Sequence, residues 1–83
     1  MCTNGVNAQQ LKGSVEQIDE AVALCRRWTH RAYHSADDSG LAKTAASLQK
    51  AQSLLDDVRA LLDEAAELVE DESAASGVSV KAV

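Results

Sequence analysis

The stretch HSADDSG, residues 34–40, separates two long segments that both have helical patterns. Serine, aspartate and glycine favour turns and helix N-caps, because they bond to nearby backbone groups or adopt turn conformations easily. We expect Asp38 or Ser39 to cap the second helix. The chain contains no proline, and both flanking segments are rich in good helix formers. The sequence therefore predicts two helices joined by a turn at about residues 36–40.

The first helix is expected to span about residues 8–35. Asn7 precedes Gln10 by three residues, the spacing of a capping box that starts a helix. Apolar and small side chains then recur at alternating steps of four and three residues, which places them on one stripe that should face a partner. This stripe consists of Leu11, Val15, Ile18, Val22, Cys25, Thr29 and Ala32. On this interpretation Cys25 is a small core residue.

The second helix is expected to span about residues 41–73. It carries one large apolar residue per heptad, a spacing that is typical of coiled coils. These residues are Leu41, Leu48, Leu55, Leu62 and Val69, followed at three residues by Thr44, Ala51, Val58 and Ala65. The short connection predicts an antiparallel helical hairpin over residues 8–75. Residues 1–7 and 76–83 are expected to be flexible tails, with Gly77 as the helix stop.

The apolar face of the second helix is wider than one neighbouring helix can cover, because Leu54, Leu61 and Leu68 flank its heptad stripe. The predicted fold class is therefore all-α, an antiparallel two-helix hairpin with coiled-coil-like packing that dimerises into a four-helix bundle. A larger assembly or a different protein could cover the same face. The predicted self-association residues are Val22, Cys25, Leu48, Leu54, Leu55, Val58, Leu61, Leu62, Leu68 and Val69.

Composition excludes several classes of protein. Thirteen acidic residues against eight basic ones give a net charge of -5, which repels nucleic-acid phosphates and favours a basic protein partner. The first ten residues lack the pattern of a secretory signal, and no window reaches about 18 uninterrupted apolar residues. We expect a cytoplasmic protein that contacts neither nucleic acid nor membrane. Cys2 and Cys25 do not form a disulfide framework, and no cofactor is expected.

Residues 25–40 hold both histidines, and the first question is whether they bind a metal. His30 and His34 are four residues apart, a spacing that can bind zinc if a residue such as Asp37 or Asp38 supplies a third ligand. Nearby arginines oppose a cation, so we favour another interpretation. Arg26, Arg31 and similar cationic side chains near the end of a helix interact favourably with its negative C-terminus.

The same segment also contains residue types that are common at protein interfaces. Tryptophan, tyrosine and arginine anchor many protein–protein contacts. The predicted partner patch consists of Arg27, Trp28, Arg31 and Tyr33.

No Gly-rich phosphate loop or nucleophile-elbow sequence is present, so we expect no enzyme. The sequence predicts a small non-catalytic helical interaction or assembly module that self-associates through its heptad face and binds a protein partner. The alternative is an acidic inhibitor or decoy that binds a basic, nucleic-acid-binding protein through the second helix. Its acidic residues are Asp56, Asp57, Asp63, Glu64, Glu67, Glu70, Asp71 and Glu72.

Two families have a similar size and hairpin plan. The plan resembles the small helical substrates of type VII secretion, which carry Trp-x-Gly in the turn and Tyr-x-x-x-Asp/Glu near the C-terminus. Here Trp28-Thr29-His30 precedes the turn and lacks the glycine, and the spacing from Tyr33 to Asp37 occurs in the wrong place. The plan also resembles small homodimeric hairpins that regulate plasmid RNA, whereas this chain is acidic. We assign the chain to neither family.

Overall fold

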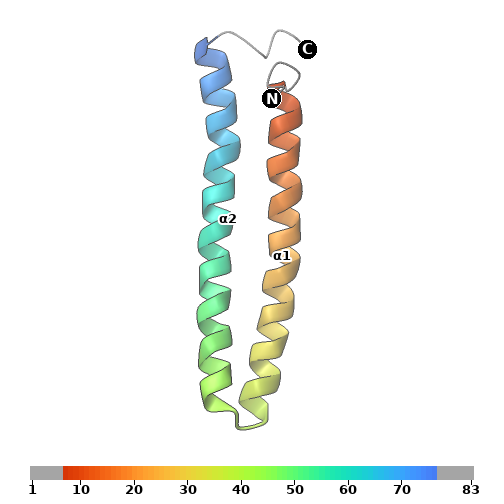
Figure 1. Ribbon diagram of the computed structural model, residues 1–83, viewed down its shortest axis with the longest axis vertical. Helices are drawn as coiled ribbons and strands as arrows, with labels where there is room; N and C mark the ends of the chain where they lie inside the picture. Colours follow the sequence, from red (N-terminus) through yellow and green to blue (C-terminus); the bar gives the residue numbers. More distant parts are fainter. Residues whose placement is uncertain (1–6, 77–83) are drawn as a thin grey trace, which may run out of the picture.

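The computed structural model describes residues 7–76, and for residues 75 and 76 it describes only the backbone. Two helices, α1 (Ala8–Asp38) and α2 (Ala42–Ser76), lie side by side and antiparallel (Figure 1). The predicted all-α hairpin is thus confirmed, and the molecule is a rod with extents of 56 × 19 × 18 Å. Cys2, Gly77 and most of the two predicted tails lie outside the described residues.

The predicted N-cap of the first helix is present. Asn7 has extended backbone angles, with φ -98° and ψ 167°, and its Oδ1 accepts a hydrogen bond from the Gln10 backbone N–H at 2.8 Å. This bond satisfies one of the N–H groups that have no partner within the helix. From Ala8 the helix continues without interruption past Gly13 and ends at Asp38, three residues beyond the predicted end.

The turn is a Schellman motif around Gly40, and it lies later in the chain than predicted. Gly40 has φ +79°, the left-handed conformation that glycine adopts without a Cβ clash. Its N–H donates to the Asp37 carbonyl at 3.1 Å, and the Leu41 N–H donates to the Ala36 carbonyl at 2.9 Å. These bonds satisfy carbonyls at the end of α1, so the polar residues before Gly40 remain helical.

The cap of the second helix also differs from the prediction. Leu41, rather than Asp38 or Ser39, precedes α2 and accepts the first helical hydrogen bond from Ala45 N–H at 2.9 Å. Asp38 is the last residue of α1, and Ser39 is its C-cap. The glycine stops the first helix so late that no side-chain cap remains available for the second.

The seam between the helices contains both apolar and polar residues. Seam residues follow 4-3 spacing in both helices, and all are half-buried or buried. The apolar or small members are Val15, Val22, Thr29 and Ala36 on α1 and Ala45, Leu48, Leu55, Leu62, Ala66 and Val69 on α2. The polar members are Lys12, Asp19, Arg26 and Tyr33 on α1 and Gln52 and Arg59 on α2. Within the described part of the chain only Ala36 and Ala45 are buried, so the core is thin.

The predicted stripe of the first helix is therefore split. Val15, Val22 and Thr29 face α2, whereas Leu11, Ile18, Cys25 and Ala32 are exposed. The prediction that Cys25 is a core residue is wrong for the single hairpin, where Cys25 is exposed. The reason is that α2 meets α1 on the other side of the Val15 row, where charged residues of α1 find partners on α2.

Candidate functional site

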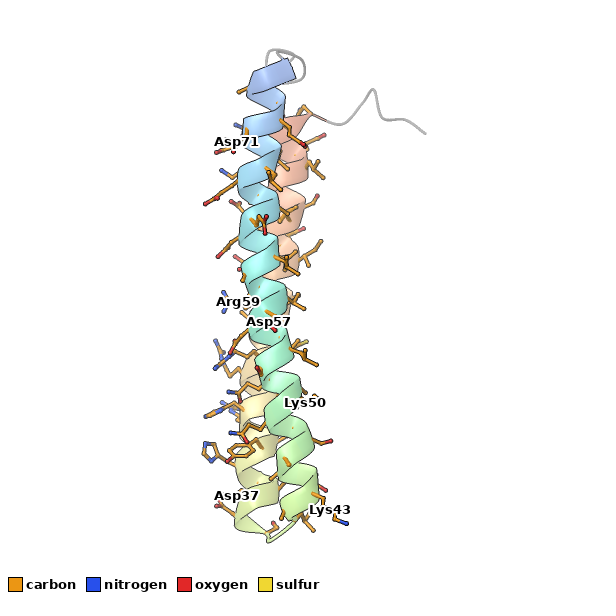
Figure 2. All side chains as sticks on the ribbon, turned by 90° about the vertical axis from the view of Figure 1, so that its left-hand side faces the viewer. Asp37, Lys43, Lys50, Asp57, Arg59 and Asp71 are labelled. Carbon is orange, nitrogen blue, oxygen red and sulfur yellow. The ribbon has the colours of Figure 1, made fainter. Side chains whose placement is uncertain are left out.

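The hairpin has two unlike long sides. In Figure 2, seen from the α2 side, side chains that carry nitrogen and oxygen gather along one edge, and carbon dominates the upper part of the other. At 100° per residue, the exposed apolar residues lie about 70–130° from the seam in the same rotational sense on both helices. Because the helices are antiparallel, the same sense on each helix places these residues on the same side of the hairpin.

We call this side the apolar face. Its members again follow 3-4 heptad spacing on each helix, so each helix carries a second coiled-coil stripe beside the seam. On α1 the stripe consists of Leu11, Ser14, Ile18, Ala21, Cys25, Trp28 and Ala32. On α2 it consists of Ala51, Leu54, Val58, Leu61, Ala65 and Leu68. Leu61 is 63% exposed, Trp28 59% and Leu54 55%. Large apolar side chains that remain this accessible along a whole face typically mark an interaction surface.

The α1 part of the apolar face is hollowed. A shallow, open depression on α1 is lined by Ser14, Gln17, Ile18, Glu20, Ala21 and Leu24. Along the helix the small side chains of Ser14 and Ala21 alternate with the larger Ile18 and Leu24. Space of this kind can accept a side chain from another helix, as in knobs-into-holes packing.

The predicted self-association set is divided between the seam and the apolar face. Five residues pack in the seam: Val22, Leu48, Leu55, Leu62 and Val69. Five others are exposed on the apolar face: Cys25, Leu54, Val58, Leu61 and Leu68. The sequence pattern alone could not separate these two groups.

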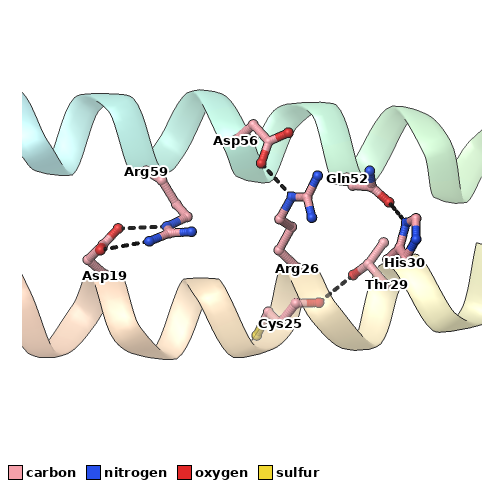
Figure 3. Close-up of polar contacts among 8 residues, drawn as sticks. All are labelled: Asp19, Cys25, Arg26, Thr29, His30, Gln52, Asp56 and Arg59. Atoms are coloured by element: carbon pink, nitrogen blue, oxygen red, sulfur yellow. Dashed lines mark hydrogen bonds and ion pairs between the residues drawn. The ribbon is translucent and has the colours of Figure 1, made fainter.

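The opposite side, which we call the polar edge, carries the polar contacts between the helices (Figure 3). Arg59 donates two hydrogen bonds to Asp19, at 3.0 and 3.2 Å. Arg26 Nε donates to Asp56 at 2.6 Å, and Lys12 donates to Glu70. These pairs join positions that lie level in the antiparallel hairpin, so they favour one register of α2 against α1.

Two of these pairs shift the ionisation of their members. The hydrogen bonds from Arg59, and then its positive charge, lower the pKa of Asp19 below its usual value. The hydrogen bond from Lys12 to Glu70 and the attraction between them raise the pKa of Lys12. Each shift favours the charged form of the residue, the carboxylate of Asp19 and the ammonium of Lys12.

The two histidines join the polar edge through a short hydrogen-bond chain. His30 Nδ1 lies 2.9 Å from Gln52 Oε1, which can only accept, so His30 is the donor. His30 Nε2 lies 3.1 Å from His34 Nε2. In the described residues no group of three or more His, Cys, Asp or Glu side chains is arranged to hold a metal ion. Asp38, the suggested third ligand, is exposed at the end of α1.

The predicted partner patch is not one surface. Arg31 Cζ lies 4.9 Å from the centre of the Trp28 ring, which joins these two residues at the border of the apolar face. Tyr33 instead contacts the histidines, with its ring centre 5.2 Å from that of His34. At 100° per residue, Arg27 lies nearer to the histidine side than to Trp28. Arg31 thus lies between Trp28 and Arg27, whereas Tyr33 packs apart from them in the seam.

The basic residues before the turn do not act at the helix terminus as predicted. Because α1 continues to Asp38, its last turn contains no basic residue. Arg26 instead pairs with Asp56, and Arg31 lies over Trp28.

The outward side of α2, opposite α1, carries a row of charges. This charged row consists of Lys43, Lys50, Asp57, Glu64 and Asp71, one residue per heptad and all exposed. Figure 2 shows Lys43 and Lys50 toward the turn, Asp57 farther along and Asp71 near the open end. In the heptad of the apolar face these residues occupy the g position, which flanks the apolar stripe and determines partner orientation in coiled coils.

Neither described helix contains an apolar stretch long enough to cross a membrane. Comparisons of the chain with protein-family models, curated proteins and solved structures found no match.

Sequence reasoning missed the ion pairs of the polar edge. A signal for them was present, because Lys12, Asp19 and Arg26 recur every seven residues and lie next to the apolar stripe. Folding the chain at Gly40 places residues of opposite charge at the same level on α2. Testing each possible turn position for such matches would have found these pairs.

Proposed function

We propose that this protein is a small non-catalytic assembly module whose apolar face binds a second copy of the chain to form a four-helix bundle. The observation that carries the proposal is the second heptad stripe on each helix, which the hairpin leaves uncovered. Trp28, Leu54 and Leu61 are each more than half exposed in one chain. A four-helix bundle buries such stripes between two hairpins.

The size of the face supports a stable dimer. A side of the rod measures 56 × 19 Å, or about 1,000 Å² in projection. Standard protein interfaces bury about 800 Å² per partner. The thin core supports the same conclusion, because only two alanines are buried in the described part of one chain. Burial of the apolar face would add the large side chains that the hairpin core lacks.

Charge favours a second copy as the occupant of the face. Residues 26–50, around the turn, carry five basic and two acidic residues. Residues 56–72, toward the open end, carry eight acidic residues and Arg59 as the single base. Each copy therefore has a basic turn end and an acidic open end, which can pair with the opposite ends of a second copy. Exposed pairs contribute only about 0–1 kcal/mol each, so burial drives the association and charge selects the partner.

Sedimentation velocity and helix content over a dilution series, from about 1 to 500 μM, test the proposal. The wild type should sediment as a dimer and lose helix content on dilution. Leu61→Ser should shift the dimer dissociation constant upward about 30-fold or more, since an interface leucine contributes roughly 2–5 kcal/mol. The matched control is Ala60→Ser, which changes the adjacent residue but lies on the side of α2 away from the apolar face.

A wild-type chain that remains a fully helical monomer over the whole dilution series would contradict the proposal. Equal effects of Leu61→Ser and Ala60→Ser would contradict it as well, because a side chain that stays exposed has little to lose.

The acidic decoy is the second candidate. Its support is that Asp57, Glu64, Glu67 and Asp71 are exposed along α2. Two of its eight carboxylates, Asp56 and Glu70, already pair with α1. Replacing Asp63, Glu64, Glu67 and Asp71 with Ser or Gln should abolish capture of a basic protein such as a histone. Unchanged capture would exclude this function.

A further inference from the structure

We infer that the two hairpins of the proposed dimer run antiparallel, with α1 on α1 and α2 on α2, about a two-fold axis that passes near Val58. This inference rests on the proposed self-association and names its geometry. The alternative is a parallel dimer, in which each α2 packs on α1 of the other copy. Three observations favour the antiparallel arrangement.

The first observation is that the α1 stripe complements itself in size. An axis midway between Ile18 and Cys25 places Leu11 opposite Ala32 of the second copy, and Ile18 opposite Cys25. Each large side chain then meets a smaller one. The same axis brings Trp28 within about one residue of the level of Ser14 of the second copy, at the edge of the depression on α1. A large aromatic residue thus meets a small one there.

The second observation is that one axis can serve both helices. On α2 the stripe is symmetric about Val58, with Ala51 and Ala65 equally distant on either side. The ion pairs give the levels of the two helices: Asp19 lies level with Arg59, and Arg26 with Asp56. The midpoint of Ile18 and Cys25 is therefore level with about residue 58 of α2. The centres of the two stripes coincide within about one turn of helix, as a single perpendicular axis requires.

The third observation is the charged row. An axis near Val58 places Lys43 beside Asp71 of the second copy and Lys50 beside Glu64. Symmetry doubles these to four pairs of opposite charge. In antiparallel coiled-coil contacts, g positions lie beside g positions of the partner helix, so this row is where charge can select orientation. The one like-charge meeting is Asp57 with its own copy at the axis.

The parallel dimer places the same charges unfavourably. There α2 packs on α1 of the other copy, and Lys50 is level with Arg31 at the corresponding position of α1. The other g positions of α1 are Gln10, Gln17, Leu24 and Asp38; only Asp38 carries a charge, and it is level with Lys43, so Glu64 and Asp71 find no charge there. The parallel dimer therefore replaces four attractive pairs with two attractive and two repulsive ones.

Two charge-reversed variants test the arrangement. Lys43→Glu with Lys50→Glu makes the charged row wholly acidic, and Glu64→Lys with Asp71→Lys makes it basic except at Asp57. Each variant alone should dimerise at least about 10-fold more weakly than the wild type. Mixed in equal amounts, they should form heterodimers well above the statistical half, as counted by native mass spectrometry. The variant with all four changes is the control and should dimerise like the wild type.

Disulfide cross-linking gives an independent test. With Cys2→Ser and Cys25→Ala as background, Val58→Cys should form a covalent dimer under mild oxidation, because the two residues meet at the axis. Leu68→Cys on the same face is the matched control. Its copies should lie about 30 Å apart in the antiparallel dimer, so it should not cross-link.

The outcomes separate this inference from the proposed function. A dimer whose charge variants mix statistically and whose Val58→Cys chains do not cross-link overturns the antiparallel arrangement and keeps self-association. A wild-type chain that is monomeric at every concentration overturns both.

Discussion

The two long sides of the hairpin use the same heptad spacing for different purposes. Along the polar edge, Lys12, Asp19 and Arg26 reach across the seam and find carboxylate or guanidinium partners within the chain. Along the apolar face, residues such as Leu54 and Leu61 find none and remain more than half exposed. The polar edge thus favours one register of the hairpin. The apolar face leaves exposed the apolar surface whose burial would stabilise an assembly.

The strongest test of this difference removes the apolar face alone. Leu54→Ala combined with Leu61→Ala should reduce the stability of the assembled protein by several kcal/mol, since each buried leucine contributes about 2–5 kcal/mol. The wild-type unfolding midpoint should rise with protein concentration, and that of the variant should not. Urea unfolding followed by circular dichroism at two concentrations measures both effects. A loss below about 1 kcal/mol would mean that the face is solvent-exposed in the native protein.

The turn provides a test that should affect both sides equally. Gly40 has φ +79°, and no atom lies within 4 Å of the position a Cβ would occupy, so the cost of Gly40→Ala comes from the backbone alone. We expect a loss of about 1–2 kcal/mol, because a left-handed conformation is strained in residues with a Cβ. The concentration dependence of unfolding should persist, since the apolar face is unchanged. An unchanged unfolding midpoint would show that the turn does not limit stability.

Sequence reasoning predicted the helices better than the faces they use. The 4-3 periodicity, the Asn7 cap and the polar stretch before Gly40 are local signals, and each led to a feature that the structure contains. The choice between the seam and the apolar face is not local. On α1 the residues Val15, Val22 and Thr29 belong both to the seam and to the stripe that the sequence pattern predicted. Which side α2 covers depends on charge matches such as Asp19 with Arg59, forty residues apart, that become apparent only after the chain is folded at the correct turn.

A smaller effect is expected on the side of α1 away from the apolar face. Gly13 lies within α1, and a Cβ there would meet no atom within 4 Å. Gly13→Ala should therefore stabilise the protein by about 0.5–1 kcal/mol, because alanine loses less backbone freedom in a helix. The dimer dissociation constant should not weaken. Loss of self-association in this variant would mean that the interface lies on the Gly13 side of α1 rather than on the apolar face.

The smallest effect is expected at the polar edge, and it depends on pH. Arg59 lowers the pKa of Asp19 in the folded chain relative to the unfolded one. The Asp19–Arg59 pair therefore contributes stability above the unfolded pKa of about 4, and that contribution disappears as the pH falls through the lower folded value. Asp19→Asn should be less stable than the wild type at pH 6, and in urea titrations the difference should shrink as the pH falls through the folded pKa of Asp19. Lys12→Gln is the contrasting variant, because the pKa of Lys12 is raised and its contribution to stability is lost as the pH rises through the folded value, far above pH 6. A stability difference between Asp19→Asn and wild type that does not shrink as the pH is lowered from 6 would show that Asp19 acts through packing rather than through its charge.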